Sequence, residues 1–342
     1  MDKESIKQAL LDMPDKEREA LIYEVQQESN IQSKVIEARR NKLDNKQGTC
    51  PHCGSCKYTM YGTDKGSKRY RCKSCKRTFT EYTGTWMARI HKKHLIGEYM
   101  KLMEQEKSLD KIKSHLGISK QTAFDWRHKI LSGIEHSDKG TFQGITESDD
   151  TFFLHSEKGS KHISRAPRKR GGTAKKRGIN NEHVSVLVTA DRVSEIDLTV
   201  VRLGRIKKKD INQAIGDRVS EQTILCSDSH VSYRGFAIDK KIEHHPIRAD
   251  LKQYVKKKIY HVQHVNSIDS RLKKWIESRF GGVSTKYLQK YLNWFRTKEI
   301  LKESNNFIEE FTLKSLEDLS AWAKFKAIPD LFQKLMHFAT QN

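Results

Sequence analysis

The stretch ITESDDTFFL, residues 145–154, has the composition of a β-strand but carries three carboxylates. Ile, Thr and Phe favour strands, whereas Glu147, Asp149 and Asp150 are poor strand formers that are costly to bury without partners. An exposed strand face would explain an isolated acidic pair, while a bound divalent cation would offset the cost of burial. The stretch therefore predicts a strand that is either solvent-exposed or part of a metal site.

A second carboxylate, at the end of a later strand, favours the metal site. Two further strand-like runs are HVSVLVTADR at 183–192 and EIDLTVVRL at 195–203. They are followed by TILCSD at 223–228, which ends at Asp228. An acidic residue at the carboxyl end of a buried strand is a usual position for a functional group in α/β sheets. Cys226, inside the same run, is predicted to be an ordinary core residue.

The stretch HVNSIDSRLKKW, residues 264–275, is predicted to be helical and offers two candidates for a third ligand. Asn266 and Lys273 are seven positions apart and share a helix face, and Asp269 lies close to that face. An early-strand acid, a later-strand acid and a polar group on a following helix fit an RNase H-like mixed sheet. Such a sheet would hold two Mg²⁺ ions for phosphoryl transfer. These residues alone leave the choice between Asn266 and Asp269 open.

The whole chain is strongly basic, with 65 Lys and Arg against 43 Asp and Glu, a net charge of +22. This surplus favours a polyanionic partner, because cationic side chains release counterions from phosphates. No apolar run approaches the ~18 residues of a membrane helix, and the acidic start MDKESIKQALLDM lacks the features of a secretory signal. We therefore expect a cytoplasmic protein that handles DNA or RNA and has no membrane partner.

Part of the charge is concentrated between the first two acids, at 156–178, which has nine Lys or Arg and one acid. Its Gly and Pro content predicts a flexible loop. Beside a metal site, such a loop would grip the phosphates of the reacting strand. The cations that we expect to contact DNA are Arg168, Lys169, Arg170, Lys175, Lys176 and Arg177.

Five of the six cysteines lie between positions 50 and 75, in CPHCGSC at 50–56 and CKSC at 72–75. Two CxxC turns separated by a short hairpin are typical of a structural zinc site, since each turn supplies two thiolates to one tetrahedral ion. Cys56 could replace Cys53, and His52 is interpreted as a loop residue. The predicted zinc ligands are Cys50, Cys53, Cys72 and Cys75.

The stretch SLDKIKSHLGISKQTAFDWRHKIL, residues 108–131, predicts two helices separated at Gly117. Ser119 is placed to cap the second helix. Leu116, Ile118, Ala123 and Trp126 would form the core where the helices cross. This pattern fits a helix-turn-helix, although any helical hairpin with a Gly turn is similar. Cations and polar residues of the second helix would enter a major groove: Lys120, Gln121, Thr122, Arg127 and Lys129.

The predicted fold class is multidomain α/β, with mostly helical N-terminal modules ahead of a mixed-sheet catalytic domain. The expected order is a helical leader, a zinc ribbon, a DNA-binding helix-turn-helix, an RNase H-like catalytic domain and C-terminal helices. The corresponding ranges are 1–45, 46–85, 90–135, 142–300 and 301–342.

These motifs together resemble bacterial insertion-sequence transposases of the DDE superfamily, in the ISXO-like group that carries a zinc ribbon. The resemblance covers about residues 46–300 and includes CPHC, ESDDTFF, SDSHVSY and HVNSIDSRLKKW. It implies that Asp149 and Asp228 are the first two catalytic acids. It also implies that Asn266 is the third metal ligand, followed after seven residues by Lys273, in an Asp-Asp-Asn-Lys pattern. Asp269 and Glu147 are the reserve candidates.

The implied activity is DNA transposition. The protein would bind the terminal inverted repeats of its element and use Mg²⁺ or Mn²⁺ to cleave the ends and join them to target DNA. The implied partners are double-stranded DNA and further copies of the chain on that DNA, in the bacterial cytoplasm near the nucleoid. One alternative is a DNA-binding regulator with an inactive catalytic domain. Another is an RNase H-like nuclease that cleaves without strand transfer.

Overall fold

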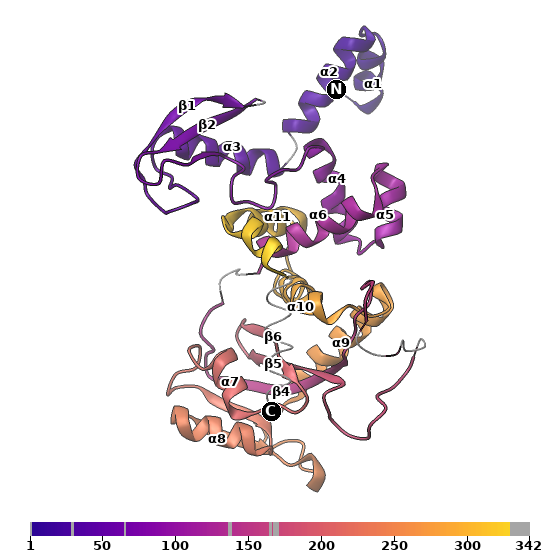
Figure 1. The fold of residues 1–342 in the computed structure, drawn as a ribbon. Coiled ribbons are helices and arrows are strands. Elements are labelled where there is room, and N and C mark those ends of the chain that lie inside the picture. The colour runs from indigo at the N-terminus through magenta and orange to yellow at the C-terminus, as the bar shows by residue number, and fades with distance from the viewer. Residues whose placement is uncertain are drawn as a thin grey trace. The chain divides into compact units, whose positions relative to one another are not determined.

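The chain divides into two compact units in the computed structural model (Figure 1). The structure describes residues 2–28, 31–64, 66–135, 139–163, 166 and 171–328. Unit 1 comprises Met1–Gly133 and Asn306–Trp322, and unit 2 comprises Ile134–Asn305 and Ala323–Asn342.

Unit 1 begins with helices and continues into a small antiparallel sheet. The helices are α1 (Lys3–Leu11), α2 (Asp15–Glu28) and α3 (Ile31–Asp44). The sheet has the order β1-β2-β3, with strands β1 (Tyr58–Asp64), β2 (Ser67–Cys72) and β3 (Thr78–Thr80). Its core is built from the rings of Tyr58, Tyr70 and Phe79, whose centroids lie 5.5–5.8 Å apart. Leu43 of α3 belongs to the same core, and its carbonyl accepts a hydrogen bond of 3.0 Å from the Tyr58 hydroxyl, so the sheet packs against this helix.

The helical hairpin of unit 1 lies where the sequence predicts it. After a short 3-10 turn (Lys93–Leu95), the helices are α4 (Ile96–Glu104), α5 (Leu109–Leu116) and α6 (Lys120–Gly133). Gly117 ends α5 with φ +60°, a conformation that costs Gly little. The hydroxyl of Ser119 accepts a hydrogen bond from the Thr122 N–H at 3.0 Å, which confirms the predicted cap. Ile118, Ala123 and Trp126 are buried as expected.

A late segment of the chain completes unit 1. Helix α11 (Phe307–Glu317) contacts α3, α4 and α6. Its Phe311 and Leu316 are buried. Residues 307–317 therefore share a core with the first 133 residues.

Unit 2 is built on a five-stranded mixed sheet in the order β6-β5-β4-β7-β8. Strands β4, β5 and β6 pair antiparallel, and β7 and β8 pair parallel beyond β4. The strands are β4 (Ile145–Leu154), β5 (His183–Asp191), β6 (Ile196–Leu203), β7 (Ile224–Asp228) and β8 (Glu243–Ile247). The first four match the predicted runs, and β8 was not predicted. The prediction of an α/β protein with a mixed sheet is confirmed.

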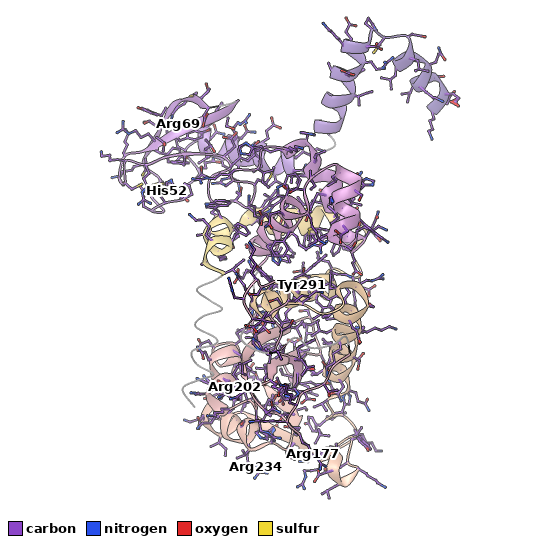
Figure 2. All side chains as sticks on the ribbon, turned by 45° about the vertical axis from the view of Figure 1, so that its right-hand side comes forward. His52, Arg69, Arg177, Arg202, Arg234 and Tyr291 are labelled. Carbon is purple, nitrogen blue, oxygen red and sulfur yellow. The ribbon has the colours of Figure 1, made fainter. Side chains whose placement is uncertain are left out.

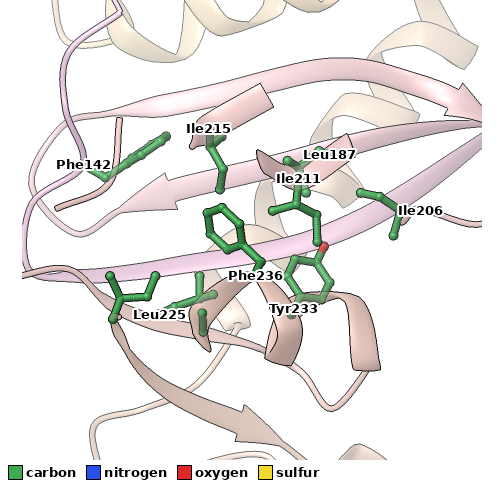
Figure 3. Packing of buried hydrophobic residues seen from close by; sticks show 10 residues of the cluster. Phe142, Leu187, Ile206, Ile211, Ile215, Leu225, Tyr233 and Phe236 are labelled. Atoms are coloured by element: carbon green, nitrogen blue, oxygen red, sulfur yellow. The ribbon is translucent and has the colours of Figure 1, made fainter. Parts of the chain in front are cut away.

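Helices pack against this sheet. Helices α7 (Lys208–Ile215) and α8 (Val231–Lys240) pack against each other and against its strands. Figure 3 shows this core, where Ile211, Ile215, Tyr233 and Phe236 of the helices meet Leu187 of β5. Helix α9 (Gln263–Phe280) contacts β4 and β5, and α10 (Thr285–Ile300) contacts β6. A 3-10 turn (Ala249–Leu251) precedes α9. Among the described residues, every helix is too short or too polar to span a bilayer.

Candidate metal centre

The acidic residues of β4 divide between the two faces of the sheet. Successive side chains of a strand point to opposite faces, so Glu147 and Asp149 share one face and Asp150 lies on the other. Asp150 is the register partner of Leu187, which belongs to the core formed with α7 and α8. Glu147 instead contacts the backbone of α9 at His264. The face of Asp149 is therefore the face that α9 covers.

Three carboxylates nevertheless converge near the middle of β4. Asp149, Asp150 and Asp228 each have an oxygen within 4.8 Å of the others. The cause is the parallel pairing of β4 with β7, in which Ser148 is opposite Ser227, so that Asp228 ends β7 beside the two acids. The strand acid and the later acid predicted from the sequence are thus brought together. Carboxylate oxygens at this spacing are the donor set that Mg²⁺ or Mn²⁺ prefers.

Burial makes the ionised form of these acids costly. Burial, with smaller contributions from the charges of Asp150, Asp228 and Asp269, raises the pKa of Asp149 to about 7, although a hydrogen bond from the Asp150 N–H opposes the shift. Burial likewise raises the pKa of Asp150 to about 6, together with the charge of Asp228, while His230 and Arg205 oppose the shift. A divalent cation would remove both the desolvation cost and the repulsion. The local electrostatics therefore fit a metal site.

Helix α9 places Asp269 outside the cluster of three carboxylates but near enough for its charge to act on Asp149. Asp269 is half-buried, and its Oδ2 accepts a hydrogen bond of 2.9 Å from Lys273 Nζ, one turn later. Its Oδ1 is buried and has no hydrogen-bond partner within the described part of the chain. A buried carboxylate oxygen without a donor is costly, and a cation is the partner that would satisfy it. Asn266 has an exposed side chain, so Asn266 as the third ligand stays a prediction.

The carboxylate of Glu147 is hydrogen-bonded to Arg192 and to the first turn of α9. It is fully buried, and its Oε1 accepts hydrogen bonds from Arg192 Nε at 3.2 Å and Nη2 at 3.1 Å. Its Oε2 accepts from the backbone N–H groups of His264 at 2.9 Å and Val265 at 3.3 Å. Both oxygens therefore face donors of the protein. No sequence signal indicated Arg192, which lies 45 positions after Glu147.

Tyr233 is a further residue of the centre that sequence reasoning missed. It lies in the first turns of α8, is fully buried, and has its ring in the core shown in Figure 3. Burial and the charges of Asp150, Asp149 and Asp228 hold its pKa well above the usual value, so the phenol stays protonated. The signal available was its position five residues after Asp228, within SDSHVSY.

The four predicted cysteines form a second cluster, in unit 1. Their sulfur atoms lie within 4.8 Å of one another, and the Sγ–Sγ distances of Cys50–Cys75 and Cys53–Cys72 are both 3.7 Å. A disulfide needs roughly 2.05 Å, whereas a tetrahedron with metal–sulfur bonds of ~2.3 Å has edges of ~3.8 Å. The Cys75 N–H, 3.5 Å from the sulfur, lowers the pKa of Cys72 to about 6. Cys56 is exposed and lies outside the cluster.

The predicted DNA-reading residues of α6 have different environments. Lys120 and Gln121 are exposed, and they bond to Asp110 at 2.9 Å and Asp125 at 2.8 Å respectively. The side chain of Thr122 is half-buried. Two cations point into the unit: Arg127 is buried and donates to the Lys107 carbonyl at 2.6 Å, and Lys129 lies 4.9 Å over the Trp322 ring.

The predicted basic loop is described at 156–163, 166 and 171–178. Lys175, Lys176 and Arg177 are exposed, and Arg177 is labelled in Figure 2. The Lys175 N–H donates to the carboxylate of Glu182, which holds this end of the loop near β5. Arg168, Lys169 and Arg170 lie outside the described residues.

One comparison with known protein families concerns unit 2. Residues 141–298 match the family described as the ISXO2-like transposase domain. The matched residues include the three clustered acids Asp149, Asp150 and Asp228 and all of α9. The prediction of an insertion-sequence transposase is confirmed.

A relative belongs to a mobile element. The chain is 24% identical over 261 residues to an uncharacterised protein in transposable element ISH50 of Halobacterium salinarum. The match covers 73% of this chain and 84% of that protein.

Two solved structures show more distant likenesses. The Mos1 strand transfer complex has 13% identity and a TM-score of 0.27, covering 66% of this chain and 77% of its own. A Mos1 transposase paired-end complex has 12% identity and a TM-score of 0.25, covering 68% and 76%. Likenesses this distant do not establish a shared fold.

Proposed function

We propose that the transposase domain catalyses metal-dependent phosphoryl transfer on DNA at the centre formed by Asp149 and Asp228. The observation that carries this proposal is the convergence of half-buried, mutually repelling carboxylates with oxygens within 4.8 Å of one another. The sheet order β6-β5-β4-β7-β8, with two strands parallel to β4, supports an RNase H-like fold for the domain. In this arrangement the acids lie on the central strand and its parallel neighbour.

We propose Asp269, in preference to Asn266, as the acid that α9 adds to the pair. Its charge acts on Asp149, and its buried Oδ1 lacks a partner among the residues described. A carboxylate also supplies the negative charge that an amide lacks. Lys273 pairs with Asp269 and would contact the reacting phosphate when Asp269 holds a metal.

The centre accounts for both steps of transposition. Bound divalent ions would activate the attacking water or 3′-hydroxyl and stabilise the leaving oxygen. The carboxylates of Asp149 and Asp228 would hold those ions at a fixed place on the sheet. Tyr233 and the core around it exclude water from one side. End hydrolysis and strand transfer differ in the attacking hydroxyl, so one centre suffices for both.

Basic surfaces on both units would bind the DNA. In unit 2 these are the exposed cations Lys175, Lys176 and Arg177. In unit 1 a shallow pocket of the small sheet is lined by Tyr61, Thr78 and five basic side chains, without an acidic residue among its described lining. We call this the ribbon basic surface; its basic residues are His52, Arg69, Arg71, Lys76 and Arg77. Figure 2 labels two of them, His52 and Arg69.

The ribbon basic surface has the composition of a nucleic-acid contact. The guanidinium carbons of Arg69 and Arg71 lie 5.7 and 5.3 Å from the ring centre of Tyr61, which is half exposed. Cations bind phosphates, and an exposed aromatic ring stacks on bases or sugars. We propose that a zinc ion at the four cysteines holds this surface together. The exposed Lys120 and Gln121 of α6 would add contacts to the same DNA.

The proposal is tested by cleavage and strand-transfer assays with Mn²⁺ or Mg²⁺, using the ends of the DNA element that carries the gene. We expect Asp149→Asn and Asp228→Asn to abolish both cleavage and joining while end binding persists. Asp217→Asn, which changes an exposed acid, serves as the matched control. Joining at the wild-type rate by either centre variant would contradict the proposal. Cleavage without joining by the wild type would instead identify a nuclease.

A further inference from the structure

We infer that Glu147 is a positioning residue that fastens the first turn of α9 to the central strand β4 and thereby sets the place of Asp269. The inference rests on the proposed metal centre, but the tether itself can be measured without metal or DNA. It assigns Glu147 a role other than that of a metal ligand.

The contacts of Glu147 are those of a helix cap supplied from another element. The first N–H groups of a helix have no intrahelical acceptor and need one from elsewhere. The residue before α9, Val262, offers no side-chain cap. Glu147 Oε2 takes this role for His264 and Val265, at 2.9 and 3.3 Å, from 117 and 118 positions earlier in the chain. A carboxylate here also interacts favourably with the positive end of the helix dipole.

The other oxygen of the carboxylate is held by Arg192 and His261. Arg192, which follows β5, donates to Glu147 Oε1 through Nε and Nη2. His261 Nδ1 lies 3.2 Å from the same oxygen, and its Nε2 lies 3.2 Å from Arg192 Nη2. These groups compensate a carboxylate that is fully buried. Glu147 therefore has little freedom to turn toward the metal centre.

The residue spacings along β4 and along α9 explain how this tether positions Asp269. Glu147 and Asp149 are two strand positions apart on one face, which is roughly 6.7 Å. Val265 and Asp269 are four helix positions apart on one side, a rise of roughly 6 Å. With Val265 held at Glu147, these nearly equal steps bring Asp269 opposite Asp149. The effect of the Asp269 charge on Asp149 agrees with this placement.

A carboxylate suits the site better than an amide. Glu147 receives N–H donors at both oxygens. A Gln side chain of the same size would present an NH₂ group to one set of these donors. The remaining oxygen should stay with the charged, doubly donating Arg192, so we expect Glu147→Gln to preserve the packing but turn its NH₂ group toward the first turn of α9 and release it.

The first measurement is hydrogen exchange of the metal-free, full-length protein. In Glu147→Gln we expect faster exchange in residues 263–269, with unchanged exchange in β5 and β7 as evidence that the sheet is intact. Glu221→Gln, at an exposed acid, is the matched control. Unchanged exchange in the first turn of α9 would overturn the tether. If exchange rises but the wild-type protein neither cuts nor joins DNA, the proposed function fails and the tether stands.

The second measurement is a double-mutant cycle on Mn²⁺ affinity. Residues that orient metal ligands change affinity by about 10- to 100-fold, so we expect Glu147→Gln to weaken Mn²⁺ binding by at least about tenfold. A residue that acts through Asp269 has no further effect once Asp269 is lost. Glu147→Gln should thus leave the affinity of Asp269→Asn unchanged. A full, additive loss in the double variant would show that Glu147 contacts the metal itself and would overturn the inference.

Discussion

The indole Nε1 of Trp86 donates a hydrogen bond of 3.0 Å to the hydroxyl of Ser315, which lies 229 positions later in the chain. Both side chains are fully buried. Ser315 belongs to α11, and the bond joins that helix to the segment that follows the small sheet. The core of unit 1 is therefore complete only when the chain has returned from unit 2.

The packing of α11 against α6 leaves no room for a larger residue at Gly133. A Cβ added there would lie 2.1 Å from the Ser315 carbonyl oxygen and 2.8 Å from Trp86 Cδ1. Because a backbone oxygen cannot move aside without moving α11, we expect Gly133→Ala to destabilise unit 1 by roughly 2–3 kcal/mol. Urea unfolding followed by Trp fluorescence measures the change.

Gly235→Ala is the control for that substitution. Gly235 is also helical, but its added Cβ would meet only the flexible Cδ of Lys208, at 3.0 Å. This change should be neutral or slightly stabilising, since Ala has the higher helix propensity. Equal losses of stability in the two variants would mean that the close approach of Gly133 to Ser315 is unimportant.

The stability of the metal-free protein should depend on pH through Asp149. Its pKa is about 7 in the folded protein and 3.8 in the unfolded chain, so folding favours the protonated acid. The stabilising effect of that proton is complete below pH 4 and is lost as the pH rises through 7. The loss is on the order of 4 kcal/mol. We expect the Tm of the metal-free wild type to fall over this window.

Asp149→Asn provides the comparison. It should remove most of this pH dependence and raise the metal-free Tm at pH 8, because a neutral amide replaces a buried charge. Mn²⁺ should raise the Tm of the wild type more at pH 8 than at pH 5.5, and should leave that of Asp149→Asn nearly unchanged. A metal-free Tm that is flat from pH 4 to 8 would argue against the raised pKa.

Zinc removal should unfold the small sheet of unit 1. Its aromatic core is limited to a few rings around Tyr70, and the four thiolates supply the missing cross-link. We expect one zinc ion per chain by atomic emission, and faster exchange in residues 58–80 after chelation. Cys72→Ser should lose the ion, whereas Cys56→Ser should retain it. Zinc loss in Cys56→Ser would mean that Cys56 is the ligand in place of Cys53.

The ribbon basic surface should contribute to DNA affinity without setting sequence preference. Each lost phosphate contact reduces the slope of log affinity against log salt by about 1. We expect this reduction for Arg71→Ala, on element ends and on unrelated duplexes alike. Arg127→Ala is a poor probe of DNA contact because its guanidinium is buried against Lys107. An unchanged salt slope in Arg71→Ala would remove this surface from the proposed DNA contact.

The sequence indicated the central strands but not the edge of the sheet. The alternation and apolar content of β4, β5, β6 and β7 are strong signals. Strand β8 reads EHHPI, and Pro246 is a residue that weakens any strand prediction. It is tolerated because β8 pairs on one side with β7 and forms the edge of the sheet. The position of β8 at the edge of the sheet outweighs the low strand propensity of Pro246.

The residues of the candidate site were likewise only partly predictable from the sequence. The strand patterns pointed to the acids of β4 and to Asp228 at the end of β7, whereas the choice of Asp149 among the β4 acids was implied by the family resemblance. The cap from Glu147 to α9 could not be inferred, since it joins residues 117 positions apart through backbone N–H groups. The burial of Arg127 was equally hidden, because a helix pattern does not show that its guanidinium turns inward to the Lys107 carbonyl.

The third ligand is decided by comparing Asn266 with Asp269. Both lie on one side of α9, but Asp269 has the buried oxygen without a partner and the charge that acts on Asp149. We expect Asp269→Asn to reduce strand transfer by at least about a thousandfold, as loss of a metal-binding carboxylate removes several kcal/mol of transition-state stabilisation. Asn266→Ala should retain joining within about tenfold, since its exposed amide would contact only the DNA. Both variants should fold, because neither side chain lies on the apolar stripe of α9 that includes Ile268 and Leu272. The reverse order of effects would restore Asn266 as the ligand and leave Asp269 as the partner of Lys273.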